Sequence, residues 1–228
     1  MSSILDAFVL AVKDIFTGDP EVWNITARSL EISCSSTFFG ALIFVPLGCL
    51  IHFNEFRGKR LLVNIIQTFY SLPTVFVGLV VFLVIRNVGP LGFLDLLFTP
   101  VAIVIGEVVL IGPIVTGLTI SALRGVGPEI RDTAVSLGAT RLQTVRTMLI
   151  EAKFGTLTAV LVGFGRAISE VGLALIVGGN IAGYTRTLPT GISLYANQGQ
   201  VAKALALGII LITLALIVSV MVNRLQQR

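Results

Sequence analysis

Two ionisable side chains, Arg166 and Glu170, lie four positions apart inside a largely apolar segment. Residues at this spacing share one face of a helix. Ionisable groups inside a membrane-spanning segment are costly unless they meet a partner or a water-filled path. Two interpretations stay open: an ion pair that stabilises a helix bundle, or an arginine that lines or gates an anion path while the glutamate holds it in place.

Glu107 is a third ionisable residue within an apolar segment. It follows Gly106, and we expect Gly112 and Pro113 to kink the helix just beyond it. Because no residue nearby in the sequence pairs with Glu107, we expect it to hold a neighbouring helix; a place on a central path is the alternative.

The apolar segments lack the residue patterns of enzymes. They carry no paired histidines, no Ser-Lys dyad and no zinc-protease motif, and the chain has no phosphate-binding P-loop. We therefore expect a subunit without catalytic residues, metal or cofactor of its own. Nucleic acid is not an expected partner, because the basic residues form no cluster interleaved with aromatic ones.

The composition predicts the fold class. The chain has 228 residues, of which 55% are hydrophobic and 12% charged, whereas a soluble domain carries roughly 25% charged residues. A bilayer core of about 30 Å is crossed by roughly 20 apolar residues in a helix. We expect a single-domain, all-α integral membrane protein with five transmembrane helices, over residues 32–53, 61–85, 100–123, 154–177 and 201–222.

Residues 1–20 have a different pattern, in which apolar residues recur at helical spacing and Asp6, Lys13 and Asp14 lie off the apolar stripe. We expect an amphipathic helix on the outer membrane surface. A sixth span is the alternative, against which the three charges argue. The stripe comprises Ile4, Leu5, Phe8, Val9, Val12, Ile15 and Phe16.

Basic residues indicate the orientation, because cytoplasmic loops carry an excess of Lys and Arg. Ten of the 16 Lys and Arg residues lie after the first span, between the third and fourth spans, or at the C-terminus. This distribution predicts an outer N-terminus and a cytoplasmic C-terminus. The ten are Arg57, Lys59, Arg60, Arg124, Arg131, Arg141, Arg146, Lys153, Arg224 and Arg228.

Residues 129–144 are polar and still have a helical pattern, with Pro128 near the start and acidic Glu129 and Asp132 in the first turns. Gly138, in the middle, costs a helix about 1 kcal/mol relative to Ala, so we expect a bend or a close backbone contact there. From these residues alone, the helix is equally a docking element for a soluble partner or an ordinary solvated loop helix.

Residues 132–150, DTAVSLGATRLQTVRTMLI, resemble the EAA loop of the membrane subunits of ABC importers. In that family the loop sits in a cleft of the ATP-hydrolysing subunit and couples the ATPase to the spans. Two departures from the family pattern are Thr133, which replaces an Ala, and Glu151, which replaces a Pro. The coupling residues that the resemblance implies are Asp132, Ala134, Gly138 and Ala139.

Residues 163–192, GFGRAISEVGLALIVGGNIAGYTRTLPTGI, look like the corresponding part of molybdate, tungstate and sulfate permeases. The stretches GRAISEVG and TRTLPTGI lean toward the tungstate branch. The turns after the fourth span offer polar groups that either contact a docking protein or an oxyanion, or cap a re-entering loop. These groups belong to Asn180, Thr185, Arg186 and Thr187.

The resemblance implies a permease with type I ABC importer architecture in a bacterial or archaeal cytoplasmic membrane. It also implies a homodimer, two cytoplasmic ABC ATPase subunits that hold ATP and Mg, and an external oxyanion-binding protein. Tungstate is the expected cargo, with molybdate, sulfate or phosphate as alternatives. A stand-alone secondary carrier is a further alternative, although no internal repeat is evident. A membrane scaffold is another, but it leaves Arg166 and Glu170 unexplained.

Overall fold

The computed structural model describes residues 4–227, and its regular elements are helices. Residues 1–3 of the expected N-terminal helix, the side chains of Ile4 and Leu5, and Arg228 of the basic C-terminus lie outside the described part. The elements are α1 (Ile4–Thr17), α2 (Pro20–Phe53), α3 (Lys59–Thr68), η1 (Phe69–Ser71), α4 (Thr74–Ile85), η2 (Gly92–Leu94), α5 (Pro100–Arg124), α6 (Pro128–Ser136), α7 (Arg141–Glu151), α8 (Lys153–Ile168), α9 (Gly172–Gly178), α10 (Leu188–Asn197) and α11 (Val201–Gln226).

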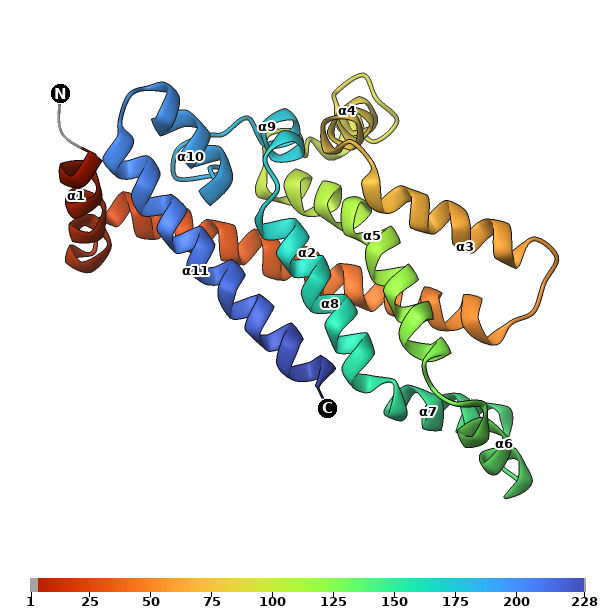
Figure 1. The fold of residues 1–228 in the computed structure, drawn as a ribbon. Coiled ribbons are helices and arrows are strands. Elements are labelled where there is room, and N and C mark those ends of the chain that lie inside the picture. The colour runs from red at the N-terminus through yellow and green to blue at the C-terminus, as the bar shows by residue number, and fades with distance from the viewer. Residues whose placement is uncertain (1–3, 228) are drawn as a thin grey trace.

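Three of the described helices, α2, α5 and α11, are each long and apolar enough to cross a membrane. The number rises to five if two bent pairs each count as one span: α3 with α4, bent by 101°, and α7 with α8, bent by 65°. Figure 1 shows the long helices crossing one another in a bundle, with α1 beside one end and α6 and α7 projecting from the other.

Two of the expected spans are not single straight helices. The segment 61–85 breaks at 72–73, because Pro73 has no N–H with which to continue the helix. The segment 154–177 breaks at 169–171, between α8 and α9. The first span, expected from residue 32, belongs to a helix that already begins at Pro20, where the Asp19 carboxylate accepts hydrogen bonds from the N–H groups of Glu21 and Val22 at 2.8 and 3.1 Å.

The helix expected over residues 129–144 is two helices, which corrects the prediction of a continuous one. α6 ends at Ser136, and Gly138 follows with a φ of +78°, a left-handed conformation that favours glycine. Thr140 then begins α7: its hydroxyl accepts from the N–H of Gln143, and the Gln143 side chain accepts from the N–H of Thr140. Of the two features expected at Gly138, the bend is present and divides the polar segment, whereas no other group lies within 4 Å of a methyl group built there.

Helix α1 packs against α11 through small residues. Ala7 and Ala11 are buried, and Ala11 belongs to a cluster with Leu207 of α11. The apolar side chains Phe8 and Phe16 of the expected stripe are exposed. Ile15 of the same stripe packs against this cluster, so only part of the stripe faces away from the bundle and is free to meet lipid.

Glycines bring α2 and α5 into close contact. A methyl group at Gly40 would lie 2.7 Å from the end of the Ile111 side chain, which would have to shift, and one at Gly48 would lie 2.9 Å from the carbonyl oxygen of Thr116, so Gly48 has no room for a side chain. Such close backbone approach is typical of helices that pack in lipid. On the other side of α5, Leu173 of α9 lies against Gly106.

We predict that Gly48→Val destabilises the folded protein by about 1–3 kcal/mol, because the new side chain must displace the α5 backbone. Thermal unfolding of the detergent-solubilised protein measures this change. Gly208→Val in α11 is the matched control, because a side chain there meets nothing within 4 Å. Equal unfolding temperatures for the two variants contradict the prediction.

Candidate functional site

Arg166 and Glu170 form the ion pair that their spacing suggested. An Arg166 Nη lies 3.0 Å from Glu170 Oε2, and the side chains are 31% and 2% exposed. The second oxygen of Glu170 accepts a hydrogen bond from the N–H of Leu173 at 3.0 Å. Glu170 therefore fixes the break between α8 and α9 and holds a partly exposed guanidinium group, which keeps further donors for another acceptor.

Glu107 bridges α5 and α2. Its carboxylate lies 2.7 Å from the Ser36 hydroxyl, and the Glu107 side chain is almost fully buried. The Ser36 contact agrees with the expectation that Glu107 holds a neighbouring helix. The sequence could not identify this partner, because it is 71 residues away.

The two threonines expected at the outer loop are buried and used within it. The Thr185 hydroxyl donates to the carbonyl of Gly178 at 2.6 Å and accepts from the N–H of Ile181 at 2.8 Å. Thr187 begins α10, where its N–H donates to the Thr190 hydroxyl at 2.9 Å. This is the geometry of the capping alternative, so neither hydroxyl is presented to an external ligand.

Arg186 belongs to a charged cluster that the sequence did not predict. Its guanidinium group lies 3.5 Å from the Glu21 carboxylate, 3.0 Å from the Tyr195 hydroxyl and 3.5 Å from the carbonyl of Asn180. Glu21 also accepts from Tyr195 and pairs with Lys203. Burial raises the pKa of Tyr195, so its hydroxyl stays a donor at neutral pH. The cluster ties the start of α2 to α10 and α11.

The residues expected to couple to an ATPase lie on the protruding α6–α7 segment. Asp132 and Ala134 are on α6, and Gly138 and Ala139 form the turn after it. Two large apolar side chains beside this turn are strongly exposed: Leu137 at 83% and Leu142 at 79%. Exposed apolar groups on a projecting helical turn are typical of a surface that another protein covers.

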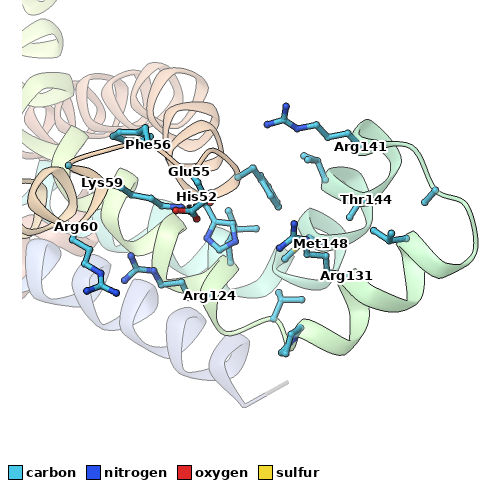
Figure 2. Close-up of a pocket in the computed structure, with 18 residues that line it drawn as sticks. His52, Glu55, Phe56, Lys59, Arg60, Arg124, Arg131, Arg141, Thr144 and Met148 are labelled. Atoms are coloured by element: carbon cyan, nitrogen blue, oxygen red, sulfur yellow. Dashed lines mark hydrogen bonds and ion pairs between the residues drawn. The ribbon is translucent and has the colours of Figure 1, made fainter.

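An open pocket of about 1000 Å³ lies at the base of this segment, between the end of α2, the α2–α3 loop, the end of α5 and α6 with α7. Figure 2 shows its charged lining. Glu55 is its one acidic residue, and the Lys59 ammonium, 2.8 Å away, lowers the pKa of Glu55. The basic lining residues are Lys59, Arg60, Arg124, Arg131 and Arg141.

Most of these cations have no acidic partner. Arg141 donates to the Asn54 amide oxygen at 2.7 Å. Arg60, Arg124 and Arg131 form no ion pair with any residue in the described part of the chain. The pocket is therefore electropositive and suited to an anion. Sequence analysis used these arginines only for orientation, because they come from separate segments that nothing in the sequence places together.

Comparison with known proteins agrees with this arrangement. The sequence model of the family described as "Binding-protein-dependent transport system inner membrane component" matches residues 44–228. The tungstate uptake system permease protein TupB of Peptoclostridium acidaminophilum is 37% identical over 227 residues, which is 100% of both chains. The protein of the same name from Campylobacter jejuni is 36% identical over 224 residues, 98% of this chain and 94% of its own.

A solved structure of the MetNI methionine ABC transporter has the same fold, with a TM-score of 0.72 at 19% sequence identity, covering 93% of this chain and 95% of that chain. The apolar helices, the sequence match and the shared fold lead to one assignment. The chain belongs to the family of binding-protein-dependent transport system inner membrane components and is a multi-pass permease subunit of an ABC transporter.

Proposed function

We propose that this chain is the membrane subunit of an ATP-driven importer that carries an oxyanion, tungstate, across the cytoplasmic membrane. The observation that carries the proposal is the full-length similarity to two tungstate uptake permeases. The chain's own residues support an anion as cargo. Arg166 is a partly exposed cation that Glu170 holds in place, and the pocket beside α6 and α7 carries unpaired arginines.

The proposed assembly is a homodimer with type I importer architecture, two cytoplasmic ABC ATPase subunits and an external oxyanion-binding protein. Each copy supplies five spans: α2, α3 with α4, α5, α8 with α9, and α11. α8 is paired here with α9, as the expected span 154–177 has it, because α7 is assigned to the cytoplasmic segment. α1 lies on the outer surface, so the N-terminus is outside and the C-terminus cytoplasmic. In support, the α2–α3 loop, α6 and α7 meet at the basic pocket, and Figure 1 places α1 and α10 toward the opposite end.

In this proposal, the α6–α7 segment transmits force from the ATPase. ATP binding closes the ATPase pair, which pushes on the turn at Gly138 and on the exposed Leu137 and Leu142. α7 contacts α8, and α8 packs against α5, so the push reaches the bundle. The spans can pack in two conformations. The equilibrium between them shifts because the two conformations bind the ATPase and the anion with different affinities.

Asp132, Ala134, Gly138 and Ala139 would meet the ATPase, and Arg166 with Glu170 would line or gate the path. Glu107 stands beside that path and holds α2 through Ser36. Asn180 and Arg186 help to hold the outer ends of α2 and α10 through the cluster around Glu21. The chain itself needs no cofactor, because ATP and Mg belong to the partner subunit.

We predict that Gly138→Glu abolishes co-purification of the ATPase, and uptake with it, because the variant strains the left-handed turn and adds a charge to the docking surface. The matched control is Gly183→Glu in the outer loop. Gly183 has a φ of +70° and equally open surroundings, so it carries the same backbone strain far from the ATPase. Intact uptake by the Gly138 variant would show that the coupling assignment is wrong.

We predict that Arg166→Ala lowers the initial rate of oxyanion uptake by about tenfold or more, equivalent to about 1.4 kcal/mol of activation free energy, while ATPase association persists. Because Glu170 would then be a buried charge without its partner, Arg166→Lys serves as a second variant that keeps a cation at this position. Folding is checked by chromatography. Unchanged uptake by both folded variants assigns Arg166 a purely structural role.

The direct test of the cargo is the tungsten and molybdenum content of cells with and without this chain, at trace supply of both oxyanions. We expect a selective loss of tungsten, restored when the chain is expressed again. Equal loss of both metals widens the site to either anion. No change in either leaves the family assignment standing, removes both anions as cargo, and makes sulfate and phosphate the next anions to measure.

A further inference from the structure

Helix α3 and the 3-10 turn η1 that continues it, to which Phe69 and Ser71 belong, together have three different faces. Val63 is buried with Ile51 of α2 and Ile120 of α5. A second face is exposed and apolar, and consists of Leu61, Ile65 and Phe69. A third face, which we call the α3 polar face, is exposed and polar, with its residues three or four positions apart: Arg60, Asn64, Gln67, Thr68 and Ser71.

The α3 polar face cannot lie against lipid. Hydrocarbon offers no hydrogen-bond partners, so exposed amides there are costly. Thr68 donates to the carbonyl of Asn64 on its own helix at 2.9 Å. The side-chain amides of Asn64 and Gln67 have no hydrogen-bond partner among residues 4–227. Within the membrane they therefore need water, a solute or a second copy of the chain as partner.

Helix α11 provides the contrast within the same protein. Its outer surface carries large exposed apolar side chains, among them Ile212, Leu216 and Val220. That is the surface expected of a helix that faces lipid. The apolar exposed face of α3, with Ile65 and Phe69, has the same character. α3 therefore stands between lipid on one side and a polar medium on the other.

The polar face is continuous with the basic pocket. Arg60, at its cytoplasmic end by the proposed orientation, also lines the pocket beside α6 and α7. From there the face runs along α3 to Ser71, where the chain breaks before Pro73 and α4 turns by 101°. The face thus runs from a cluster of unpaired cations to a break in a membrane-spanning helix, and such breaks are tolerated where they are buried in protein or line a water-filled cavity.

We propose that the α3 polar face is a water-lined wall of the oxyanion path and that the basic pocket is the site through which the anion leaves. This inference rests on the proposed function. Amide and hydroxyl groups donate hydrogen bonds to a tetrahedral oxyanion, and the face carries no acidic residue to repel it. Since Asn64, Gln67, Thr68 and Ser71 are uncharged, they bind the anion weakly enough for it to move on toward the cations.

The test measures which face of α3 meets water. The native cysteines are first replaced, as Cys34→Ala and Cys49→Ala. Single variants Asn64→Cys, Gln67→Cys and Ser71→Cys are then compared with Ile65→Cys and Phe69→Cys on the apolar exposed face of the same α3–η1 segment. Inside-out vesicles with the complete transporter are treated with a membrane-impermeant, anionic thiosulfonate. Thiols react as thiolates, which form in water and not in hydrocarbon.

We expect the three polar-face cysteines to react at least about tenfold faster than the two controls, and tungstate to slow their reaction. Equal rates on the two faces overturn the proposal, whether a second copy or lipid covers the polar face. Protection by none of tungstate, molybdate and sulfate overturns it too, because the face then holds only water. Protection by molybdate or sulfate alone supports the path and removes tungstate as the cargo.

The pocket is tested by Arg60→Gln, with Arg57→Gln as the matched control. Both variants remove one positive charge from the same loop region, but only Arg60 lines the pocket. We expect a several-fold lower uptake rate and weaker anion protection of Gln67→Cys for the Arg60 variant alone. Equal effects of the two substitutions would show that net charge at this surface, and not the pocket, attracts the anion.

Discussion

The close packing of α2 against α5 is the contact on which the rest of the structure depends. Gly40 and Gly48 let the two backbones approach, and Glu107 with Ser36 joins them by a buried hydrogen bond. α5 also holds four further helices, because α3, α4, α8 and α9 all pack against it. In a membrane this packing must come from shape and internal hydrogen bonds, because lipid is as apolar as the side chains that it would replace.

The functional groups gather where helices break. Glu170 lies between α8 and α9, where one carboxylate oxygen holds Arg166 and the other accepts the Leu173 N–H. The break between α3 and α4 ends the α3 polar face, and the turn at Gly138 separates α6 from α7. A break frees backbone groups and redirects the chain, so it can present polar groups that a continuous apolar span would keep apart.

Charged residues are paired at one end of the molecule and largely unpaired at the other. Toward α1, Arg186 and Lys203 both pair with Glu21, so the carboxylate offsets part of their charge and the cluster fastens helices together. Toward α6 and α7, Arg124 and Arg131 line an open pocket without acidic partners in the described chain. This asymmetry suits the proposed direction of transport, because unpaired cations at the exit draw an anion through an uncharged stretch.

The sequence by itself determined the membrane class, the bounds of α5 and α11 to within a few residues, the Arg166–Glu170 pair and a special backbone position at Gly138. These follow from composition and from contacts between residues a few positions apart. Hydropathy measures apolar character and not backbone direction, so it joined α3 to α4, and α8 to α9, into straight spans.

Only the tertiary structure decided that Ser36 contacts Glu107, that Glu21 pairs with Arg186 and Lys203, and that distant arginines line one pocket. Such contacts depend on how helices cross in space, and spacing along the chain does not record the crossing.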